Sequence, residues 1–267
     1  MELKESMDSI PTGASAPLLE VFASYQGEGL FVGEPQTFLR LGGCPLRCRY
    51  CDTKQSWAVP ERDGDAWVTP FGALIQVAEH ELREGPSHRP IAVTGGEPLM
   101  WPDFLLGLAD VAGDRPLHLE TAGHDCDALE RVLPIFDHLS LDLKLASDLA
   151  QPALGLPYSA GDWDTLRPRQ LQLATEHLNR GGTVSIKLLV TKHSLSPDSD
   201  SPDPILDDLK RLGPNLPLFI APESPSDARA PFDGDVLQGV DQLVAAALER
   251  GLSPRVLPQM HRALGVR

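Results

Sequence analysis

The sequence is poor in cations. Lys and Arg total 23 against 38 Asp and Glu, which gives a formal charge of −15. Such a surface repels polyanions, so we expect no nucleic acid partner. The sequence also lacks any apolar run near the ~20 residues that a bilayer crossing needs, so we expect no membrane span. The first residues, MELKESMDSIPTG, lack the basic start and apolar stretch of a secretory signal, and we therefore expect a cytoplasmic protein.

Cysteine is scarce as well. The chain has 4 cysteines in 267 residues, and Cys44, Cys48 and Cys51 share the stretch GGCPLRCRYCDT. In a reducing compartment, close-spaced cysteines more often hold a metal or do redox chemistry than form disulfides. A closed zinc site needs a fourth ligand, which Cys126 or one of the 8 histidines could supply. A four-iron cluster on three thiolates would instead leave one iron open. The spacing alone leaves both sites possible.

Strand-like and helix-like segments alternate along the chain. We expect strands at 19–23, 36–41, 91–94, 117–121, 139–145, 184–190, 218–222 and 255–258, and helices at 71–84, 103–113, 127–136, 171–180, 205–213 and 236–251. This alternation predicts an α/β fold with a parallel sheet, an incomplete (β/α)6-type barrel. We expect a single domain over 1–267, with a flexible segment at 1–17. The Pro-, Gly- and Ser/Asp-rich segments 58–67, 154–164 and 193–205 are predicted to be surface loops.

Two polar tetrads coincide with the ends of predicted strands. GGEP (95–98) follows the strand at 91–94, and ETAG (120–123) overlaps the end of the strand at 117–121. In parallel α/β folds, reactive residues lie at the carboxyl ends of strands. The two glycines of GGEP allow close approach of a ligand, and the Glu97 carboxylate can accept from an ammonium group. Taken alone, GGEP would also fit an ordinary turn.

The spacing CxxxCxxC at 44–51 resembles the signature of the radical S-adenosylmethionine (SAM) superfamily. The resemblance implies a 4Fe–4S cluster on the three cysteines. Its open iron would bind SAM, and its electron would cleave SAM to a 5′-deoxyadenosyl radical. Tyr50 matches the superfamily's aromatic position near the adenine, with local packing as an equal alternative. Gly95, Gly96 and Glu97 resemble the superfamily's methionine-binding turn.

The flanking residues resemble one family of this superfamily, the 7-carboxy-7-deazaguanine synthases of queuosine and 7-deazapurine biosynthesis. The similar stretches are EVFASYQGEG (20–29), PQTFLRLGGCPLRCRYCDT (35–53), GGEP, ETAG, LDLK (141–144) and RVLPQMHRALGV (255–266). The resemblance implies a carbon–nitrogen lyase. The radical would remove a hydrogen from C6 of 6-carboxy-5,6,7,8-tetrahydropterin, and ring contraction with loss of ammonia would give 7-carboxy-7-deazaguanine. SAM would be regenerated, and the protein would supply position and charge.

The resemblance also assigns a substrate site. Its residues would be Gln26, Gly27, Glu28, Gly29, Arg40 and Thr94. A pterin presents a flat edge of donors and acceptors, which the segment QGEG can meet without steric hindrance, although a tight turn would use the same residues. The planar fork of Arg40 can hold the substrate carboxylate with two hydrogen bonds, unless this arginine is simply solvated. Thr53 would bind a Mg²⁺ ion that touches substrate, and Asp52 would orient that ion through water or cap the next turn.

Other cofactor contacts are assigned to strand ends. Glu120, Asp142 and Lys144 would face SAM, because carboxylates suit ribose hydroxyls and an ammonium suits a carboxylate. The sequence departs from the family here. Many members carry Ser-Pro-Lys where this chain has Asp142-Leu143-Lys144, and ETNG where it has ETAG. The ribose contact is therefore less well supported than Lys144.

For three further residues the sequence supports a structural role, either beside a role in the site or in place of one. Gln259 and His261 match a C-terminal QxH of the family, and His261 fits a structural role equally well. Cys126 is interpreted as a small buried hydrophobe.

Two rival functions remain open from the residues alone. A glycyl-radical-type activating enzyme would need a docking surface for a partner protein, and a zinc-binding structural or interaction module would contain no iron. For the lyase, the need for low-potential electrons favours a flavodoxin or ferredoxin as the donor, and the resemblance implies a homodimer.

Overall fold

A computed structural model of the chain describes residues 14–62, 64–84, 89–150, 160–196, 199–225, 227 and 229–266. Its strands are β1 (Ala16–Tyr25), β2 (Pro35–Leu41), β3 (Trp67–Val68), β4 (Ile91–Gly95), β5 (Leu117–Thr121), β6 (His138–Leu143), β7 (Thr183–Val190), β8 (Leu218–Pro222) and β9 (Arg255–Val256). Its helices are α2 (Pro70–Glu84), α3 (Pro102–Ala112), α4 (Cys126–Val132), α5 (Ala160–Asn179), α6 (Asp203–Leu212), α7 (Gly234–Glu249) and α8 (Met260–Leu264). The predicted alternation of strands and helices is confirmed.

The described strands form one nine-stranded sheet in the order β3-β1-β2-β4-β5-β6-β7-β8-β9. From β2 to β9 every neighbouring pair is parallel. The expectation of parallel pairing is wrong for the start of the sheet, because β1 pairs antiparallel with both β2 and β3. The short connection from β1 to β2 contains no crossover helix, and without a crossover two consecutive strands can only pair antiparallel.

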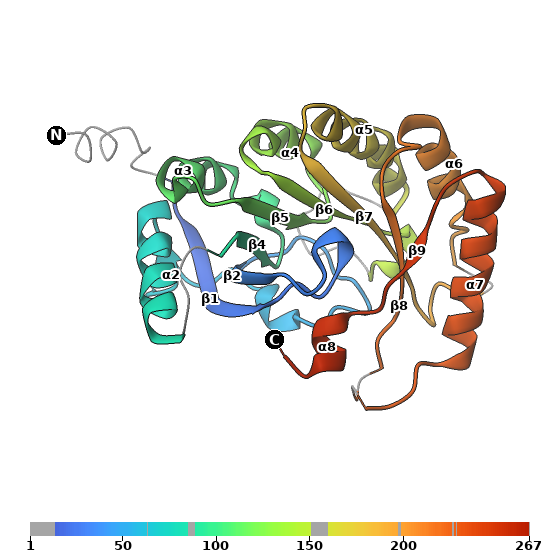
Figure 1. Cartoon of the computed structure of the whole chain (residues 1–267), viewed down its shortest axis with the longest axis horizontal. Helices are drawn as coiled ribbons and strands as arrows, with labels where there is room; N and C mark the ends of the chain where they lie inside the picture. Colours follow the sequence, from blue (N-terminus) through green and yellow to red (C-terminus); the bar gives the residue numbers. More distant parts are fainter. Residues whose placement is uncertain are drawn as a thin grey trace.

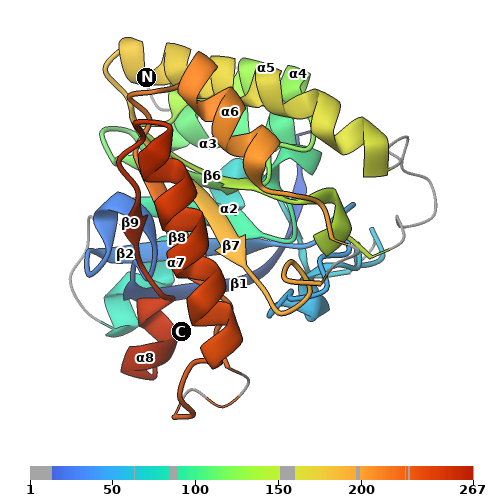
Figure 2. The same cartoon turned by 90° about the vertical axis from the view of Figure 1, so that its right-hand side faces the viewer.

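The sheet curves into a partial barrel. In the described residues β3 and β9 are its two edges and do not pair, so the barrel is incomplete as predicted. Helices α2 to α7 follow one another around the outside of the strands (Figure 1), and the view turned by 90° shows α5, α6 and α7 packed along one outer side (Figure 2). Six strand–helix units, from β2–α2 to β8–α7, account for this arrangement. The carboxyl ends of their strands open on the same side.

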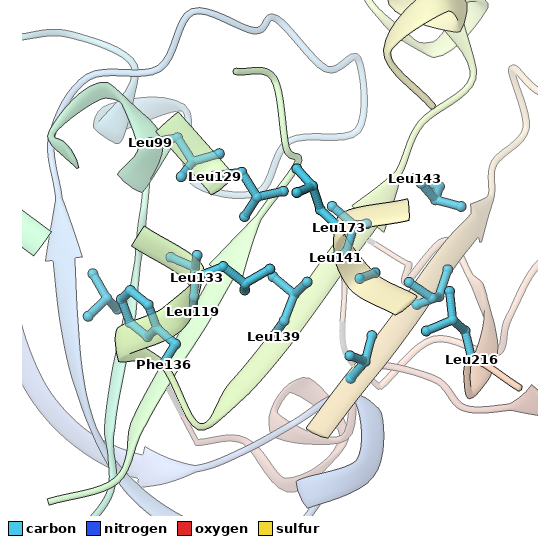
Figure 3. Packing of buried hydrophobic residues seen from close by; sticks show 14 of the residues in the cluster. Leu99, Leu119, Leu129, Leu133, Phe136, Leu139, Leu141, Leu143, Leu173 and Leu216 are labelled. Atoms are coloured by element: carbon cyan, nitrogen blue, oxygen red, sulfur yellow. The ribbon is translucent and has the colours of Figure 1, made fainter. Parts of the chain in front are cut away.

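The apolar core lies between the strands and the outer helices. Leu119, Leu139 and Leu141 point outward from β5 and β6, and Figure 3 shows them interleaved with Leu129 and Leu173 from the helices. All five side chains are fully buried or nearly so. Because successive residues of a strand face opposite sides, the residues between these leucines face the barrel interior. The outward-facing side chains therefore pack against the helices, and the inward-facing side chains are available to form a site.

Local signals explain most helix boundaries. Asp125 caps α4 by accepting from Ala128 N at 2.9 Å, and Asp233 caps α7 by accepting from Asp235 N at 3.0 Å. The predicted helix at 127–136 stops earlier, because Pro134 turns its end into a 3-10 segment, Leu133–Ile135. In contrast, α5 continues through Pro168, so this helix begins about three turns before the predicted 171–180.

Some predicted loop and tail residues belong to regular elements. Residues 1–13 of the predicted flexible segment lie outside the described residues, but Ala16 and Pro17 already belong to β1, so flexibility is wrong there. The loop prediction is wrong for three stretches that belong to regular elements: Trp67 in β3, residues 160–164 in α5 and residues 203–205 in α6. None of the helices in the described part of the chain is long and apolar enough to cross a membrane.

The core makes a direct prediction about stability. Leu119→Ala removes a side chain that is 0% exposed, and the cavity left behind should lower the free energy of unfolding by about 2–5 kcal/mol in chemical denaturation. The matched control is Leu82→Ala on the outer face of α2, where the side chain is 87% exposed and the change should stay within about 0.5 kcal/mol. Equal effects of the two substitutions would contradict this placement of the core.

Candidate functional site

A cavity of about 280 Å³ opens at the carboxyl ends of the strands. All but one of the residues predicted for the site line it: Gln26, Gly27, Glu28, Arg40, Cys44, Cys48, Tyr50, Cys51, Asp52, Thr53, Thr94, Gly95, Gly96, Glu97, Glu120, Asp142 and Lys144. The exception is Gly29, whose backbone approaches the Ser185 side chain inside the barrel. Gly29 serves the turn after β1 and does not line the cavity.

The cysteine loop, residues 42–57, is held in shape by its own backbone. Gly43 N donates to Ser56 O at 2.9 Å, and Cys44 N donates to Trp57 O at 3.2 Å. The Arg47 guanidinium donates to Cys44 O at 2.6 Å and stacks over the Trp57 ring at 4.9 Å. These contacts hold the two ends of the loop together.

The far side of the cysteine loop is joined to the segment after β6. Arg49 N donates to Asp148 O at 3.0 Å, and Ala150 N donates to Arg47 O at 2.7 Å. Asp148 is itself buried and accepts from Thr191 Oγ1 at 2.9 Å. Burial raises the pKa of the Asp148 carboxyl. The loop is therefore anchored to β6 and β7 as well as to β2.

The three thiols of the loop face the cavity in a poorly solvated place. Burial, with the nearby Glu97 carboxylate, raises the pKa of Cys44 to about 12. Burial also raises the pKa of Cys48. Cys126, the first residue of α4, does not line the cavity. Its thiol lies 3.9 Å from Leu166 O, and the side chain packs against the core. The cysteine loop thus offers three thiols and no fourth.

This donor set fits a cluster better than a single ion. Among the described residues no three or more His, Cys, Asp or Glu side chains converge as the ligands of one metal ion. Tetrahedral zinc needs four such ligands at close range, whereas three thiolates at three corners of a larger iron–sulfur cluster stand farther apart. The predicted zinc alternative therefore has no fourth ligand in the described part of the chain.

The turn Gly95–Pro98 is pressed against the cysteine loop. Gly96 N donates to Leu41 O at 2.9 Å, and Glu97 N donates to Gly43 O at 2.8 Å. Gly95 has a φ of 138°, and a Cβ atom there would lie 2.2 Å from Leu41 O, so only glycine fits. The two predicted motifs are therefore one structural unit at the ends of β2 and β4.

Glu97 is 2% exposed and already well bonded. Its carboxylate accepts from Leu99 N at 3.0 Å, from Thr121 Oγ1 at 2.5 Å and from Ala122 N at 2.9 Å. The carboxylate therefore ties the GGEP turn to ETAG at the end of β5. Since two carboxylate oxygens can accept about four hydrogen bonds, one position remains for a cation.

A row of alternating charges crosses the cavity wall from the cysteine side to the β1–β2 turn. Lys144 Nζ donates to Tyr50 OH at 3.2 Å and to Asp142 Oδ2 at 3.3 Å. Asp142 Oδ1 lies 3.0 Å from Lys187 Nζ, and Lys187 also contacts the Glu28 carboxylate. We call the four charged side chains, Lys144, Asp142, Lys187 and Glu28, the charge row.

Within the charge row, neighbouring opposite charges keep Asp142 and Lys187 ionised. Burial acts to raise the pKa of Asp142, but Lys187 and Lys144 hold it below its ordinary value. Burial acts to lower the pKa of Lys187, but Asp142 and Glu28 raise it. Sequence reasoning missed Lys187. The available signal was its position in the strand VSIKLLV, where a cation among apolar residues requires a partner.

The residues predicted to bind the pterin substrate meet near the ends of β1, β4 and β5. Gln26 Nε2 donates to Glu120 Oε1 at 2.8 Å and to Gln36 Oε1 at 3.2 Å. Thr94 is also hydrogen-bonded to Glu120, and burial raises the pKa of this carboxyl. Glu120, predicted to face SAM, therefore lies in direct contact with Gln26, predicted to face the substrate.

Arg40 stands at the apolar side of the cavity. Its guanidinium lies over the Phe22 ring at 5.1 Å, and Phe22 stacks on Phe38 at 5.0 Å with an angle of 6° between the rings. Arg40 Nε is 3.4 Å from Glu20 Oε2, a long contact that leaves the rest of the fork turned to the cavity. The solvated reading of Arg40 is wrong, since its side chain is only 18% exposed.

The C-terminal segment closes one side of the cavity. Gln259 Nε2 donates to Glu28 Oε1 at 2.9 Å, and Met260 N donates to Gly27 O at 3.0 Å. A Cβ atom on Gly27 would lie 2.1 Å from His261 Nδ1, so the glycine makes room for the histidine. Gln259, His261 and Arg262 all line the cavity, which gives the C-terminal QxH a place in the site.

One further polar group was not found from the sequence. Ser224 follows β8 and lines the cavity, and its buried hydroxyl has no hydrogen-bond partner among the described residues. A buried hydroxyl without a partner is costly, which points to a missing ligand at this wall. Nothing in the sequence distinguishes Ser224 from the other serines of its loop.

Comparison with known proteins shows which proteins the chain resembles in sequence and in fold. Residues 39–167 match the radical SAM superfamily model. The chain is 35% identical to the 7-carboxy-7-deazaguanine synthase of Methanothermobacter thermautotrophicus over 94% of this chain and 98% of that protein. It is 30% identical to the 7-carboxy-7-deazaguanine synthase of Geobacter sulfurreducens over 94% and 97% of the two chains. The crystal structure of QueE from Escherichia coli shares the fold, with a TM-score of 0.56 at 20% identity over 96% of this chain and 99% of that one.

The Gly27 contact can be tested without any ligand. Gly27→Ala places a methyl group against His261 and should loosen the C-terminal segment, so amides of residues 259–264 should exchange with deuterium faster, by roughly tenfold per 1.4 kcal/mol lost. Gly234→Ala, where a Cβ meets nothing within 4 Å, is the control and should leave this exchange unchanged. Unaltered exchange in Gly27→Ala would show that α8 does not depend on this contact.

Proposed function

The chain belongs to the 7-carboxy-7-deazaguanine synthase family of radical SAM enzymes, and from this premise we propose that its cavity converts 6-carboxy-5,6,7,8-tetrahydropterin into 7-carboxy-7-deazaguanine and ammonia. The protein is a carbon–nitrogen lyase of queuosine-type biosynthesis. The observation that carries the proposal is the joint lining of one cavity by the three-thiol loop, the GGEP turn and the Gln26–Glu28 segment.

Membership in the radical SAM superfamily brings a 4Fe–4S cluster and SAM. Cys44, Cys48 and Cys51 would hold the cluster, because they are the only thiols on the cavity wall among the described residues. When bound, the cluster and SAM supply a 5′-deoxyadenosyl radical. The loop contributes orientation, since its backbone hydrogen bonds fix the three cysteines relative to the GGEP turn.

Residues on the cysteine side of the cavity are the candidates for holding SAM. The backbone of Gly95 and Gly96 and the remaining acceptor position of Glu97 suit its amino acid part. Asp142, ionised and partly exposed, suits ribose hydroxyls even though many relatives have serine there, and Lys144 keeps that carboxylate charged. The unpartnered hydroxyl of Ser224 adds a further polar contact.

Residues at and just after the ends of β1, β4 and β5 are the candidates for holding the pterin. Gln26, Glu28, Thr94 and Glu120 present amide, carboxylate and hydroxyl groups to a flat donor and acceptor edge. Arg40 would hold the substrate carboxylate, with Phe22 beneath its guanidinium keeping the planar fork in place.

The Mg²⁺ ion is proposed to bind next to the cysteine loop. Thr53 Oγ1 lines the cavity 3.8 Å from Cys51 Sγ, and the exposed Asp52 precedes it. A hydroxyl, substrate oxygens and water would complete the octahedron that Mg²⁺ prefers, with Asp52 acting through water. The ion would polarise the substrate during ring contraction.

The rival functions are not favoured. A glycine-activating enzyme must admit a polypeptide. Gln259 and His261 line this cavity on one side, and its hydrogen-bond donors and acceptors suit a small molecule. A zinc-binding module would require ligands that the described residues do not bring together.

Partners and location complete the proposal. The enzyme acts on a small molecule, and we propose a flavodoxin or ferredoxin-type protein as its source of low-potential electrons. We also propose a homodimer, a single domain built on the one sheet, and a cytoplasmic location, where thiols stay reduced for the cluster.

The cysteine assignment predicts a clear difference between variants. After anaerobic reconstitution the protein should be brown and hold roughly four irons per chain. Cys44→Ser, Cys48→Ser and Cys51→Ser should each lose most of the iron and the visible absorbance, while Cys126→Ser should keep both. Loss of metal in Cys126→Ser, or a colourless protein containing zinc, would overturn the assignment.

The reaction itself is tested by an anaerobic assay with reductant, SAM and 6-carboxytetrahydropterin, following the product by mass and ultraviolet spectrum. We expect 7-carboxy-7-deazaguanine with several turnovers per SAM. Formation of 5′-deoxyadenosine without this product would leave the radical chemistry and remove the substrate.

The Mg²⁺ site is tested in the same assay. Added Mg²⁺ should raise the rate of product formation, and Thr53→Val should abolish that increase and lower the rate by about tenfold or more. Thr53→Ser, which keeps the hydroxyl, should retain most of the response. An equal response to Mg²⁺ in Thr53→Val would remove this residue from the ion's ligands.

A further inference from the structure

The interior of this barrel is polar below the cavity. Barrels of this kind usually fill their interior with branched apolar side chains. Here the inward positions of β5, β6 and β7 carry His118, His138, Ser140 and Ser185. His118 and His138 are 2% and 4% exposed, and their rings meet edge to face with centroids 4.3 Å apart. The proposed reaction assigns no role to either histidine.

Hydrogen bonds connect these side chains into a continuous path. Ser140 Oγ lies 2.9 Å from His118 Nε2 and 3.3 Å from His138 Nε2. On the other side of its ring, His138 Nδ1 lies 2.7 Å from Thr183 Oγ1. Every atom of the path Ser140–His138–Thr183 is therefore within hydrogen-bond distance of the next.

The two ends of this path lie in different cavities. Ser140 is partly exposed and lines the cavity of the proposed active site. Thr183, also partly exposed, and His138 line a second cavity of about 590 Å³ at the amino ends of the strands. The buried His138 ring is the connection between them.

The imidazole of His138 is suited to pass protons because it is neutral. Burial, with His177 nearby, lowers the pKa of His138 to about 4, and burial, with His138 beside it, lowers the pKa of His118 well below its ordinary value. The other ionisable groups around the second cavity are Glu34 after the β1–β2 turn, Asp137 before β6, and His177 and Arg180 at the end of α5. A neutral imidazole with both nitrogens hydrogen-bonded can accept a proton on one nitrogen and give one up from the other.

The proposed reaction needs such a proton. A carbon–nitrogen bond of the pterin breaks, and the nitrogen departs with the bonding electron pair. Product and neutral ammonia balance the substrate, so departure as ammonium takes up one additional proton per turnover. With cofactor and substrate filling the cavity, water has limited access from the open side.

We propose that Ser140 and His138 form a proton relay that delivers this proton to the leaving nitrogen from the second cavity. The proposal rests on the function proposed above. The leaving nitrogen takes the Ser140 hydroxyl proton, and Ser140 takes the proton of His138 Nε2. His138 Nδ1 then takes a proton through Thr183 from water in the second cavity. The ring ends neutral in its other tautomer, and one proton has crossed the barrel.

The test compares two serines that contact the same nitrogen of His138. Ser140→Ala breaks the path at the active-site end, whereas Ser185→Ala removes a hydroxyl 3.3 Å from His138 Nε2 that does not line the active-site cavity. In Ser140→Ala we expect kcat for 7-carboxy-7-deazaguanine to fall roughly ten- to a hundredfold, with KM changed little. The loss should grow as pH rises, because direct donation from solution then becomes scarcer. Ser185→Ala should keep kcat within about threefold and the wild-type pH profile.

Two further measurements separate a relay from damage to the fold. Cleavage of SAM to 5′-deoxyadenosine without pterin should be unchanged in Ser140→Ala, and Ser140→Thr should restore most of kcat because it keeps a hydroxyl. The relay is refuted if Ser140→Ala keeps the wild-type kcat, loses it equally at all pH values, or matches Ser185→Ala. If the wild-type protein makes no 7-carboxy-7-deazaguanine, it is the function proposed above that fails, and the comparison of the serine variants does not enter that conclusion.

Discussion

The contact of Asp142 with two lysines is the interaction on which the site depends. A partly buried carboxylate is costly unless it is paired, and Lys144, directly after β6, and Lys187, within β7, both pair with Asp142. Lys144 reaches Tyr50 beside the cysteines, and Lys187 reaches Glu28 beside the C-terminal segment. Removing Asp142 would take from Lys144 and Lys187 the carboxylate that they share. The charge row therefore connects the cysteine side of the cavity with the side formed by the C-terminal segment.

In the cysteine loop, backbone hydrogen bonds fix the site residues in place, as ion pairs do in the charge row. Its hydrogen bonds to the GGEP turn and to the segment after β6 position the three thiols. Three thiolates and a glycine turn beside them suit a cluster that must keep one iron open. The polar interior below continues from this site to the amino ends of the strands, through Ser140 and His138. The barrel interior thus connects the candidate site at one end with the second cavity at the other.

Secondary structure was predictable where one signal dominated. The strands at 117–121 and 218–222 have the predicted bounds, because short apolar runs between turn residues allow little else. The start of α5 was missed because Pro168 usually ends a helix, and here the helix passes through it. The antiparallel pairing of β1 and β2 follows from the absence of a crossover helix between them, an absence already present in the predicted order of elements.

The sequence by itself determined the chemistry of the site. CxxxCxxC, GGEP and the flanks of the cysteines are local patterns. Their residue types indicate the chemistry without knowledge of where the fold places them. Only the tertiary structure decided which distant residues complete the site. Lys187, Ser224, the packing of His261 on Gly27 and the path from Ser140 to Thr183 all join segments far apart in sequence. Such contacts depend on strand order and on which side chains face inward, and both are set by packing of the whole sheet against its helices.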